Sequence, residues 1–267
     1  MSQTTYNIQP NTGSPGLPAY ANDMETKVFT YSNVSQVINF GVGVSKVPGF
    51  DNRAALPTSG SKPIGITVRD LQQITGQYPL NSAMAVMAFG QVWVSPEVAV
   101  SADDSVYMRI DGRNQTQTLT ASIPFTAGNT FNATVTVNGN ATVLSVPFNT
   151  TNAQMLTDIA AAIAANTGVG SATSDGTSVI TVIGSLHGVN VVFTGVSVTG
   201  GATQPTITVL TTVVGIPDTD RGRFGNVADN GRCIRIEGMR WITSTASYPN
   251  NTELLAVIDI YVPYLTT

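Results

Sequence analysis

Short apolar runs, separated by glycine, proline and polar residues, follow one another through the first part of the chain. Runs of this kind are typical of β-strands. They fall at Val37–Val44, Ile64–Val68, Met84–Val94 and Val106–Ile110. Within the third run, Val92 and Val94 alternate with Gln91 and Trp93, so we expect the two pairs on opposite faces of one strand. Gly90 is expected to mark a β-bulge.

The two ends of the chain differ in pattern. Residues 1–26 contain Pro10, Pro15 and Pro18 with few core-forming residues, and proline interrupts helices and central strands. We therefore expect an extended N-terminal arm that is ordered mainly by a neighbouring subunit. Near the other end, Leu254–Val262 is almost continuously apolar, which favours a central strand buried on both faces.

The composition changes abruptly in the middle of the chain. From Asn114 to Thr212 there is no lysine or arginine, and the acidic residues are Asp158 and Asp175 alone. Threonine, valine, alanine, glycine and asparagine dominate this stretch. We interpret 114–212 as an inserted domain, which leaves a β-rich core formed by 27–113 plus 213–267.

The insert has its own local signals. Asn138-Gly139 lies between two alternating runs and predicts a tight hairpin turn. Thr151 and Gln154 have the spacing of a capping box, and they precede a helix expected over about 152–166. A second hairpin is expected at Asp175-Gly176. The insert is therefore predicted to be a small β-β-α-β-β unit with further strands.

Composition narrows the functional classes. Charged residues make up 10% of the chain and the net charge is −4, so a basic nucleic-acid-binding surface is not expected. A surface poor in charge suits a protein docked in an assembly, although an ordinary β protein solvated by hydroxyls and amides has the same composition. No signal peptide and no apolar run of membrane-spanning length is evident, so we expect synthesis in a cytoplasm and no membrane partner.

The chain offers little catalytic or metal-binding chemistry. Its sole histidine, His187, is interpreted as a turn residue, and its sole cysteine, Cys233, as a small buried group. No His/Cys spacing suits zinc, and Gly41-Val42-Gly43 lacks the remainder of a dinucleotide-binding motif. We expect no enzyme activity, no cofactor and no metal. A carbohydrate-active enzyme with dispersed carboxylates stays open as an alternative.

The richest polar stretch is the loop from Asp218 to Arg232, in which aspartate and arginine alternate around Phe224. Its resemblance to a calcium loop is faint, because arginines interrupt it and no glutamate closes it. We predict a protein interface with Phe224 as the anchor, the alternatives being a solvated loop and an ordinary core role for Phe224. The candidate interface residues are Pro10, Pro15, Pro18, Tyr20, Asp218, Asp220, Arg221, Arg223, Phe224 and Arg232.

The core resembles the structural cement or decoration proteins of tailed phages. The resemblance rests on hydrophobic and glycine patterns in the stretches Phe40–Val44, Pro63–Asp70, Val86–Val94, Val106–Met108, Gly222–Phe224, Ile236–Trp241 and Leu255–Ile260. The insert departs from the compact members of the family. The resemblance implies a mainly β protein, with a compact barrel-like or tulip-like core split by a small α+β domain.

The resemblance also implies a function. Such proteins are virion components that bind the outer surface of the assembled coat lattice and stabilise the head by bridging coat subunits. The expected partners are the major capsid protein and further copies of the chain, a homotrimer being favoured over a dimer. A weak host-surface contact through the insert is a further expectation. The alternative is a tail or tail-tip component whose insert binds the host surface.

Overall fold

The computed structural model describes residues 14–19, 26–70, 75–245 and 254–261 of the chain. The chain divides into two compact units. We call Met1–Asp111 with Asp220–Thr267 the barrel unit, and Gly112–Thr219 the insert unit. The predicted insert, 114–212, falls inside the second of these units.

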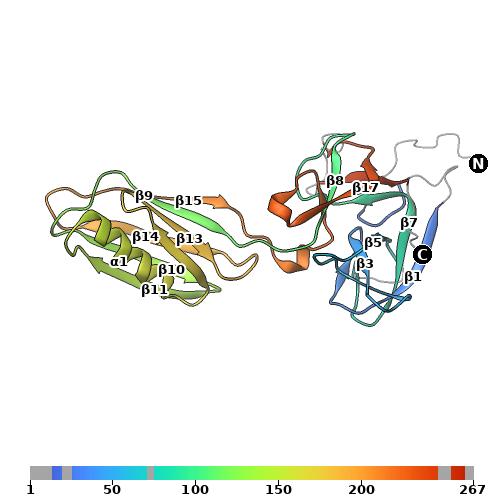
Figure 1. Cartoon of the computed structure of the whole chain (residues 1–267), viewed down its shortest axis with the longest axis horizontal. Helices are drawn as coiled ribbons and strands as arrows, with labels where there is room; N and C mark the ends of the chain where they lie inside the picture. Colours follow the sequence, from blue (N-terminus) through green and yellow to red (C-terminus); the bar gives the residue numbers. More distant parts are fainter. Residues whose placement is uncertain (1–13, 20–25, 71–74, 246–253, 262–267) are drawn as a thin grey trace, which may run out of the picture. The chain divides into compact units, whose positions relative to one another are not determined.

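The barrel unit is built almost entirely from strands (Figure 1). They are β1 (Lys27–Asn33), β2 (Ile38–Asn39), β3 (Gly43–Lys46), β4 (Arg53–Ala55), β5 (Pro63–Thr67), β6 (Gln77–Tyr78), β7 (Ala83–Val94), β8 (Ser105–Arg109), β16 (Phe224–Gly225), β17 (Cys233–Trp241) and β18 (Ala256–Ile260), with the 3-10 turn η2 (Asp229–Gly231). The main sheet has the order β1-β4-β3-β5-β7-β18-β17-β8-β16. Because β1 also pairs with β7, the first five of these strands close into a barrel, which confirms the prediction of a mainly β, barrel-like core.

The long strand β7 serves two hydrophobic layers. Met84 and Val86 belong to the cluster that also holds Tyr78 and Val44, whereas Val92 and Val94 belong to a second cluster with Trp241. Opposite β1 the register shifts between the pairs Lys27–Phe89 and Val28–Met87, so β7 carries one extra residue there. An extra residue exchanges the two faces of a strand, and here it turns the second half of β7 toward the second layer.

Gly90 does not form this bulge itself. The extra residue on β7 is Ala88, and Gly90 follows two residues later with a φ of +120°, a backbone conformation that favours glycine. The predicted separation of Val92 and Val94 from Trp93 is confirmed, because Trp93 lies in a different cluster, with Leu255 and Val257.

Strand β18 is central and buried on both faces, as its apolar sequence predicts. All five of its residues are buried, and it pairs with β7 on one side and β17 on the other. Ala256 and Ile258 face the cluster that contains Trp241, whereas Val257 packs with Trp93. Two-sided burial therefore explains why this strand lacks an alternating pattern.

Part of the predicted arm belongs to the barrel unit. The Gly16 N–H donates to the Trp93 carbonyl at 2.8 Å, and the Ala19 N–H donates to the Gln91 carbonyl at 2.9 Å. Leu17 and Ala19 also pack against the cluster of Trp93. The expectation that a neighbouring subunit orders the arm is therefore wrong for residues 14–19, because β7 of the same unit already binds them. The rest of the predicted arm, apart from Thr26, lies outside the described residues.

The insert unit packs two sheets and a helix around its own core (Figure 1). Its elements are β9 (Thr116–Ala121), β10 (Thr130–Val137), β11 (Asn140–Pro147), α1 (Asn152–Ala164), β12 (Val169–Ser174), β13 (Val179–Gly184), β14 (Val191–Thr199) and β15 (Ile207–Val213), and the 3-10 turn η1 (Asp218–Asp220) begins at its end. The sheets have the orders β11-β10-β14 and β12-β13-β9-β15. Helix α1 contacts β11, β12 and β13, and it buries Leu156, Ile159 and Ile163 in the core. Among the described residues, no helix has both the length and the apolar character that a membrane crossing requires.

The local signals of the insert form the predicted helix start and hairpin turn, although Nε2 of Gln154 donates to Oδ1 of Asp158 and only the Thr151 half of the capping box is seen. The Thr151 hydroxyl caps α1 by accepting the Gln154 N–H at 3.2 Å. Asn138 and Gly139 both have positive φ values, 51° and 78°, in the turn that joins β10 to β11. Strand β9 was not predicted, because its Thr-rich sequence buries Gln117 alongside Leu119 and so hides the apolar face.

The turn before β13 depends on one carboxylate. Oδ1 of Asp175 accepts the backbone N–H groups of Thr177, Ser178 and Val179 at 2.8, 2.9 and 3.0 Å. These hydrogen bonds, that of Val179 first, favour the charged form and lower the pKa of Asp175 from 3.8 to about 2.

We predict a pH-dependent contribution of Asp175 to the stability of the insert unit. Since the folded pKa lies below the unfolded one, the contribution is present above about pH 4 and is lost as the pH falls toward 2. Asp175→Ala should therefore speed hydrogen exchange of β12 and β13 at neutral pH and have little effect near pH 2. Asp158→Ala, on α1, controls for the lost charge. An equal effect of Asp175→Ala at both pH values would contradict the prediction.

Candidate interface site

The predicted Asp/Arg loop is tied into the barrel unit from residue 220 onward. The Gly222 N–H donates to the Arg109 carbonyl at 2.8 Å, and the Gly222 carbonyl accepts the Gly43 N–H at 2.7 Å. Gly222 has a φ of +86°, and a Cβ on it would lie 2.3 Å from the Gly43 carbonyl oxygen. The close approach of these two backbones therefore requires glycine, and this part of the loop is not a freely solvated segment.

A buried arginine fastens the loop to the sheet. The Arg109 side chain is 3% exposed, and its Nη2 donates to Oε2 of Glu97 at 2.8 Å while Nη1 donates to Oδ2 of Asp229 at 2.9 Å. Burial by itself would lower the pKa of Arg109, but the hydrogen bonds to Glu97 and Asp229 and the charge of Glu97 outweigh it and raise the pKa. We call these three residues the arginine cluster.

The arginine cluster was not predicted from the sequence. Its members come from the loop after β7, from β8 and from η2, so no local spacing connects them. Arg109 does lie within the strand-like apolar run Val106–Ile110, and a charged residue in such a run is a usable signal of a buried ion pair. The partners of Arg109 were not recognisable in the same way.

Phe224 is a core residue and not an interface anchor. It is 0% exposed, it pairs with Met108 through the short strand β16, and it lies in the cluster that contains Trp241. A side chain without exposed surface offers no contact to a partner. The anchor prediction for Phe224 is therefore wrong, and its alternative, an ordinary core role, is the one that the structure shows.

Three of the predicted interface residues meet at one hollow on the barrel unit. The hollow has a volume of about 750 Å³ and is lined by both polar and apolar residues. Pro15, Asp220 and Arg223 all line it, together with Arg69 and Glu97. Arg223 Nη1 lies 3.2 Å from Oδ2 of Asp220, and both side chains are about one-third exposed. The structure thus brings one proline of the predicted arm to the charged end of the predicted loop.

The other predicted interface residues are dispersed. Pro18 is exposed and forms an isolated bridge with Val92, while Arg221 and Arg232 are half-buried. Pro10 and Tyr20 lie outside the described residues.

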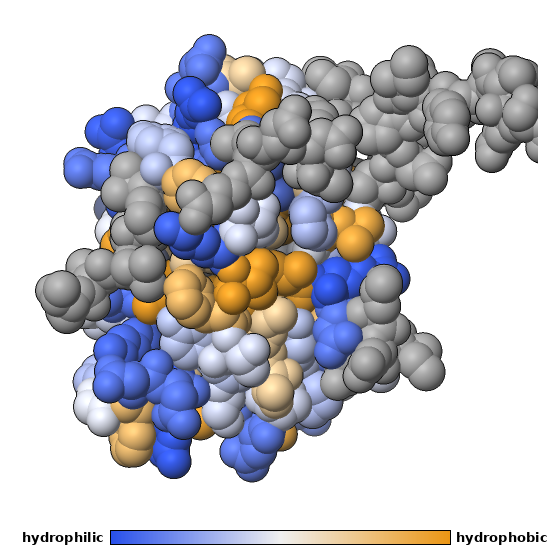
Figure 2. Space-filling model, turned by 90° about the vertical axis from the view of Figure 1, so that its right-hand side faces the viewer, coloured by the Kyte–Doolittle hydropathy of each residue, from blue (hydrophilic) through white to orange (hydrophobic). Residues whose placement is uncertain are grey.

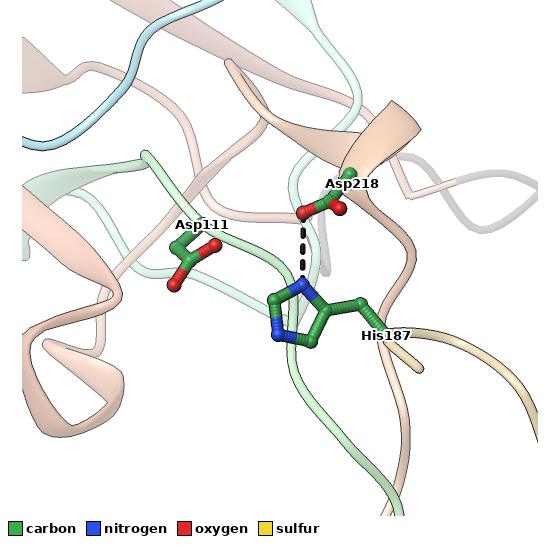
Figure 3. Close-up of side chains that lie close together, drawn as sticks. All are labelled: Asp111, His187 and Asp218. Atoms are coloured by element: carbon green, nitrogen blue, oxygen red, sulfur yellow. Dashed lines mark hydrogen bonds and ion pairs between the residues drawn. The ribbon is translucent and has the colours of Figure 1, made fainter. Parts of the chain in front are cut away.

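Asp218 belongs to the insert unit, where it contacts His187. Nδ1 of His187 lies 2.9 Å from Oδ1 of Asp218, as Figure 3 shows, and the same oxygen accepts the Gly112 N–H at 3.1 Å. A Cβ on Gly112 would lie 2.6 Å from Cβ of His187. These close contacts join the segments around Gly112, His187 and Asp218, which agrees with the interpretation of His187 as a turn residue.

The surface of the barrel unit is mixed in character. Figure 2, which faces this unit, shows apolar side chains gathered in the middle of the face with polar side chains around them. Exposed large apolar residues of the unit include Val28, Leu80, Val98 and Val227. An apolar centre with a polar rim is the usual composition of a protein–protein interface.

Comparison with known proteins gives likenesses of unequal weight. The chain is similar to the flagellar cap protein FliD D1-D2-D3 domains from Escherichia coli, with 16% identity and a TM-score of 0.28, over 67% of this chain and 56% of that chain. It is similar to the D2-D3 domains of the same protein from Serratia marcescens, with 17% identity and a TM-score of 0.27, over 66% and 94%. Scores this low support no inference about this chain.

No curated protein matches the chain. The sequence model of one family does match, over residues 2–146, and this family is described as structural cement protein (E217 gp24/Pam3 gp6). The match covers more than half of the chain and includes the strands β1 to β5 and β7 of the barrel and the first hairpin of the insert unit. The chain therefore belongs to the phage structural cement protein family, as the sequence patterns predict, and is a structural protein of the virion.

Proposed function

We propose that this protein is an auxiliary capsid protein that binds the outer surface of the assembled coat lattice and bridges neighbouring coat subunits. The observation that carries the proposal is the family match over residues 2–146. The low charge of the chain supports it, because interface centres are depleted in charged residues. The partners are the major capsid protein and further copies of the chain, a trimer being favoured.

The stabilising mechanism is mass action. A protein that binds the mature lattice and not its dissociated subunits stabilises the lattice by RT ln(1 + [L]/Kd) per site. This amounts to about 2.7 kcal/mol when the free concentration is one hundred times Kd. Many such sites on one head add up, so a small protein of modest affinity makes the shell considerably more resistant to rupture.

The hollow of the barrel unit is our candidate for the coat-binding site. It presents the opposite charges of Asp220 and Arg223 beside the exposed side chain of Arg69, which gives a partner segment charged groups of both signs to bind. Partly exposed charges of this kind direct orientation and association rate more than affinity. The buried arginine cluster holds one side of the hollow, because Glu97 belongs to both.

The proposal predicts saturable binding to heads. Purified protein added to heads that lack it should bind to a fixed number of sites, and the heads should then release DNA at a higher temperature. Arg223→Glu should weaken the binding about tenfold or more at low salt, because it places a like charge beside Asp220 and against the partner's complementary charge. Sedimentation of heads with bound protein measures occupancy.

The control is Arg235→Glu, an equal charge reversal on an exposed residue of β17 that does not line the hollow. Both variants should remain folded under the conditions of the binding assay, which thermal unfolding checks. If both variants lose head binding to the same extent, the hollow is not the coat-binding site. Absence of any binding of the wild-type protein to heads would overturn the proposed function itself.

A further inference from the structure

The strand β15 is an open edge of the insert unit. In its sheet, β15 pairs with β9, and among the described residues no strand pairs with its other side. The pairing with β9 is regular from Ile207 to Thr211 and shifts only between Thr211 and Val213. A strand edge of this kind carries a row of backbone donors and acceptors directed outward.

The direction of these backbone groups follows from the hydrogen bonds. The Ser122 N–H donates to the Thr206 carbonyl, and the register places Thr208 and Leu210 at the equivalent positions opposite Thr120 and Thr118. In an antiparallel pair the hydrogen-bonding residues alternate. The N–H and C=O groups of Ile207, Val209 and Thr211 therefore point away from β9 on the open side.

Nothing in β15 blocks this edge. The strand has no charged residue and no proline, and Leu210 is 59% exposed. Two other edges of the insert unit differ: β11 ends in Pro147, and β12 contacts helix α1. Proteins commonly protect edges by such devices, and their absence is typical of an edge that pairs with another chain.

The chemistry of the edge points to a second copy of this chain. The insert unit has four charged residues, Arg113, Asp158, Asp175 and Asp218, so two copies approach without strong repulsion and a charged partner finds little to recognise. Beyond the family function, we propose that β15 pairs antiparallel with β15 of a second copy, which belongs to a neighbouring trimer, about a two-fold axis at Val209. The two four-stranded sheets then form one continuous sheet.

This arrangement fixes a register. With Val209 opposite itself, Thr208 of one copy lies opposite Leu210 of the other, and Ile207 lies opposite Thr211. Because the N–H groups of Thr208 and Leu210 point toward β9, these two residues form a non-hydrogen-bonded pair across the new contact. Cα atoms of such a pair lie about 4.5 Å apart, which suits a disulfide.

The register gives a direct test in the full-length protein. Thr208→Cys and Leu210→Cys are prepared separately and oxidised alone and as a mixture, both in concentrated solution and on decorated heads. The mixture should give a disulfide-linked dimer, and each variant alone should give none. Cys233 is buried, and the wild-type protein controls for it. Equal cross-linking of one variant alone, or no cross-linking in solution or on heads, would overturn the proposal.

A second measurement separates pairing from folding. Leu210→Lys adds a charge to the edge and should weaken self-association about tenfold or more by sedimentation velocity, because an edge charge opposes strand addition. Val143→Lys is the matched control, since Val143 is a 78% exposed residue of β11 in the other sheet. Equal self-association of Leu210→Lys and wild type would contradict the pairing. Leu210→Lys should still bind heads through the barrel unit. Its self-association therefore tests the β15 pairing, whereas head binding tests the proposed cement function on which the pairing rests.

Discussion

Arg109→Ala is expected to destabilise the barrel unit by about 3–5 kcal/mol. The substitution leaves the carboxylates of Glu97 and Asp229, whose side chains are 13% and 11% exposed, without the cation that both of them bind. Removing one partner of a buried ion pair leaves an uncompensated charge, which costs far more than an exposed pair contributes. Trp93 and Trp241 both lie in the barrel unit, so tryptophan fluorescence in a denaturant titration follows this unit alone.

The control for this prediction is Arg223→Ala. Arg223 also pairs with an aspartate, but both side chains are about one-third exposed, so the loss should be at most about 1 kcal/mol. Arg109→Lys should lie between the two, because lysine keeps the charge but loses the bidentate contact in which Nε and Nη2 of Arg109 bind the two carboxylate oxygens of Glu97. If Arg109→Ala unfolds at the same denaturant concentration as Arg223→Ala, the arginine cluster does not hold the fold.

Phe224→Ala is expected to destabilise the free protein by about 3–5 kcal/mol. The ring is fully buried beside Met108 in the layer beneath β7 and β17, and its removal leaves a cavity that the surrounding strands fill only in part. A loss of this size lowers the melting temperature of the barrel unit by several degrees. Thermal unfolding followed by tryptophan fluorescence measures it without any head present.

Val227→Ala is the comparison for Phe224→Ala. Val227 is three residues away and 57% exposed, so its truncation should change stability by less than about 0.5 kcal/mol. At temperatures where Phe224→Ala remains folded, its head binding should be close to that of the wild type. An unchanged melting temperature combined with lost head binding would instead restore the anchor role of Phe224.

Local features of the chain were predictable because neighbouring residues determine them. The helix begins where Thr151 caps it, and the turn at Asn138-Gly139 needs only two residues that tolerate positive φ. The change of composition at Asn114 also indicated a separate unit, since a composition persists along a domain.

Contacts between distant segments were decided by the tertiary structure alone. Closure of the barrel depends on β1 pairing with β7, and Phe224 is buried because β16 pairs with β8, more than one hundred residues away in sequence. The arginine cluster joins residues 97, 109 and 229 in the same way. An aromatic residue beside arginines has the same local pattern at an interface and in a core, so the pattern alone left both roles open for Phe224. The sequence by itself determined the helix, the insert and the strands with clear apolar patterns, but not β9. Only the packing of distant strands decided which polar residues lie inside, because burial depends on neighbours that local patterns do not identify.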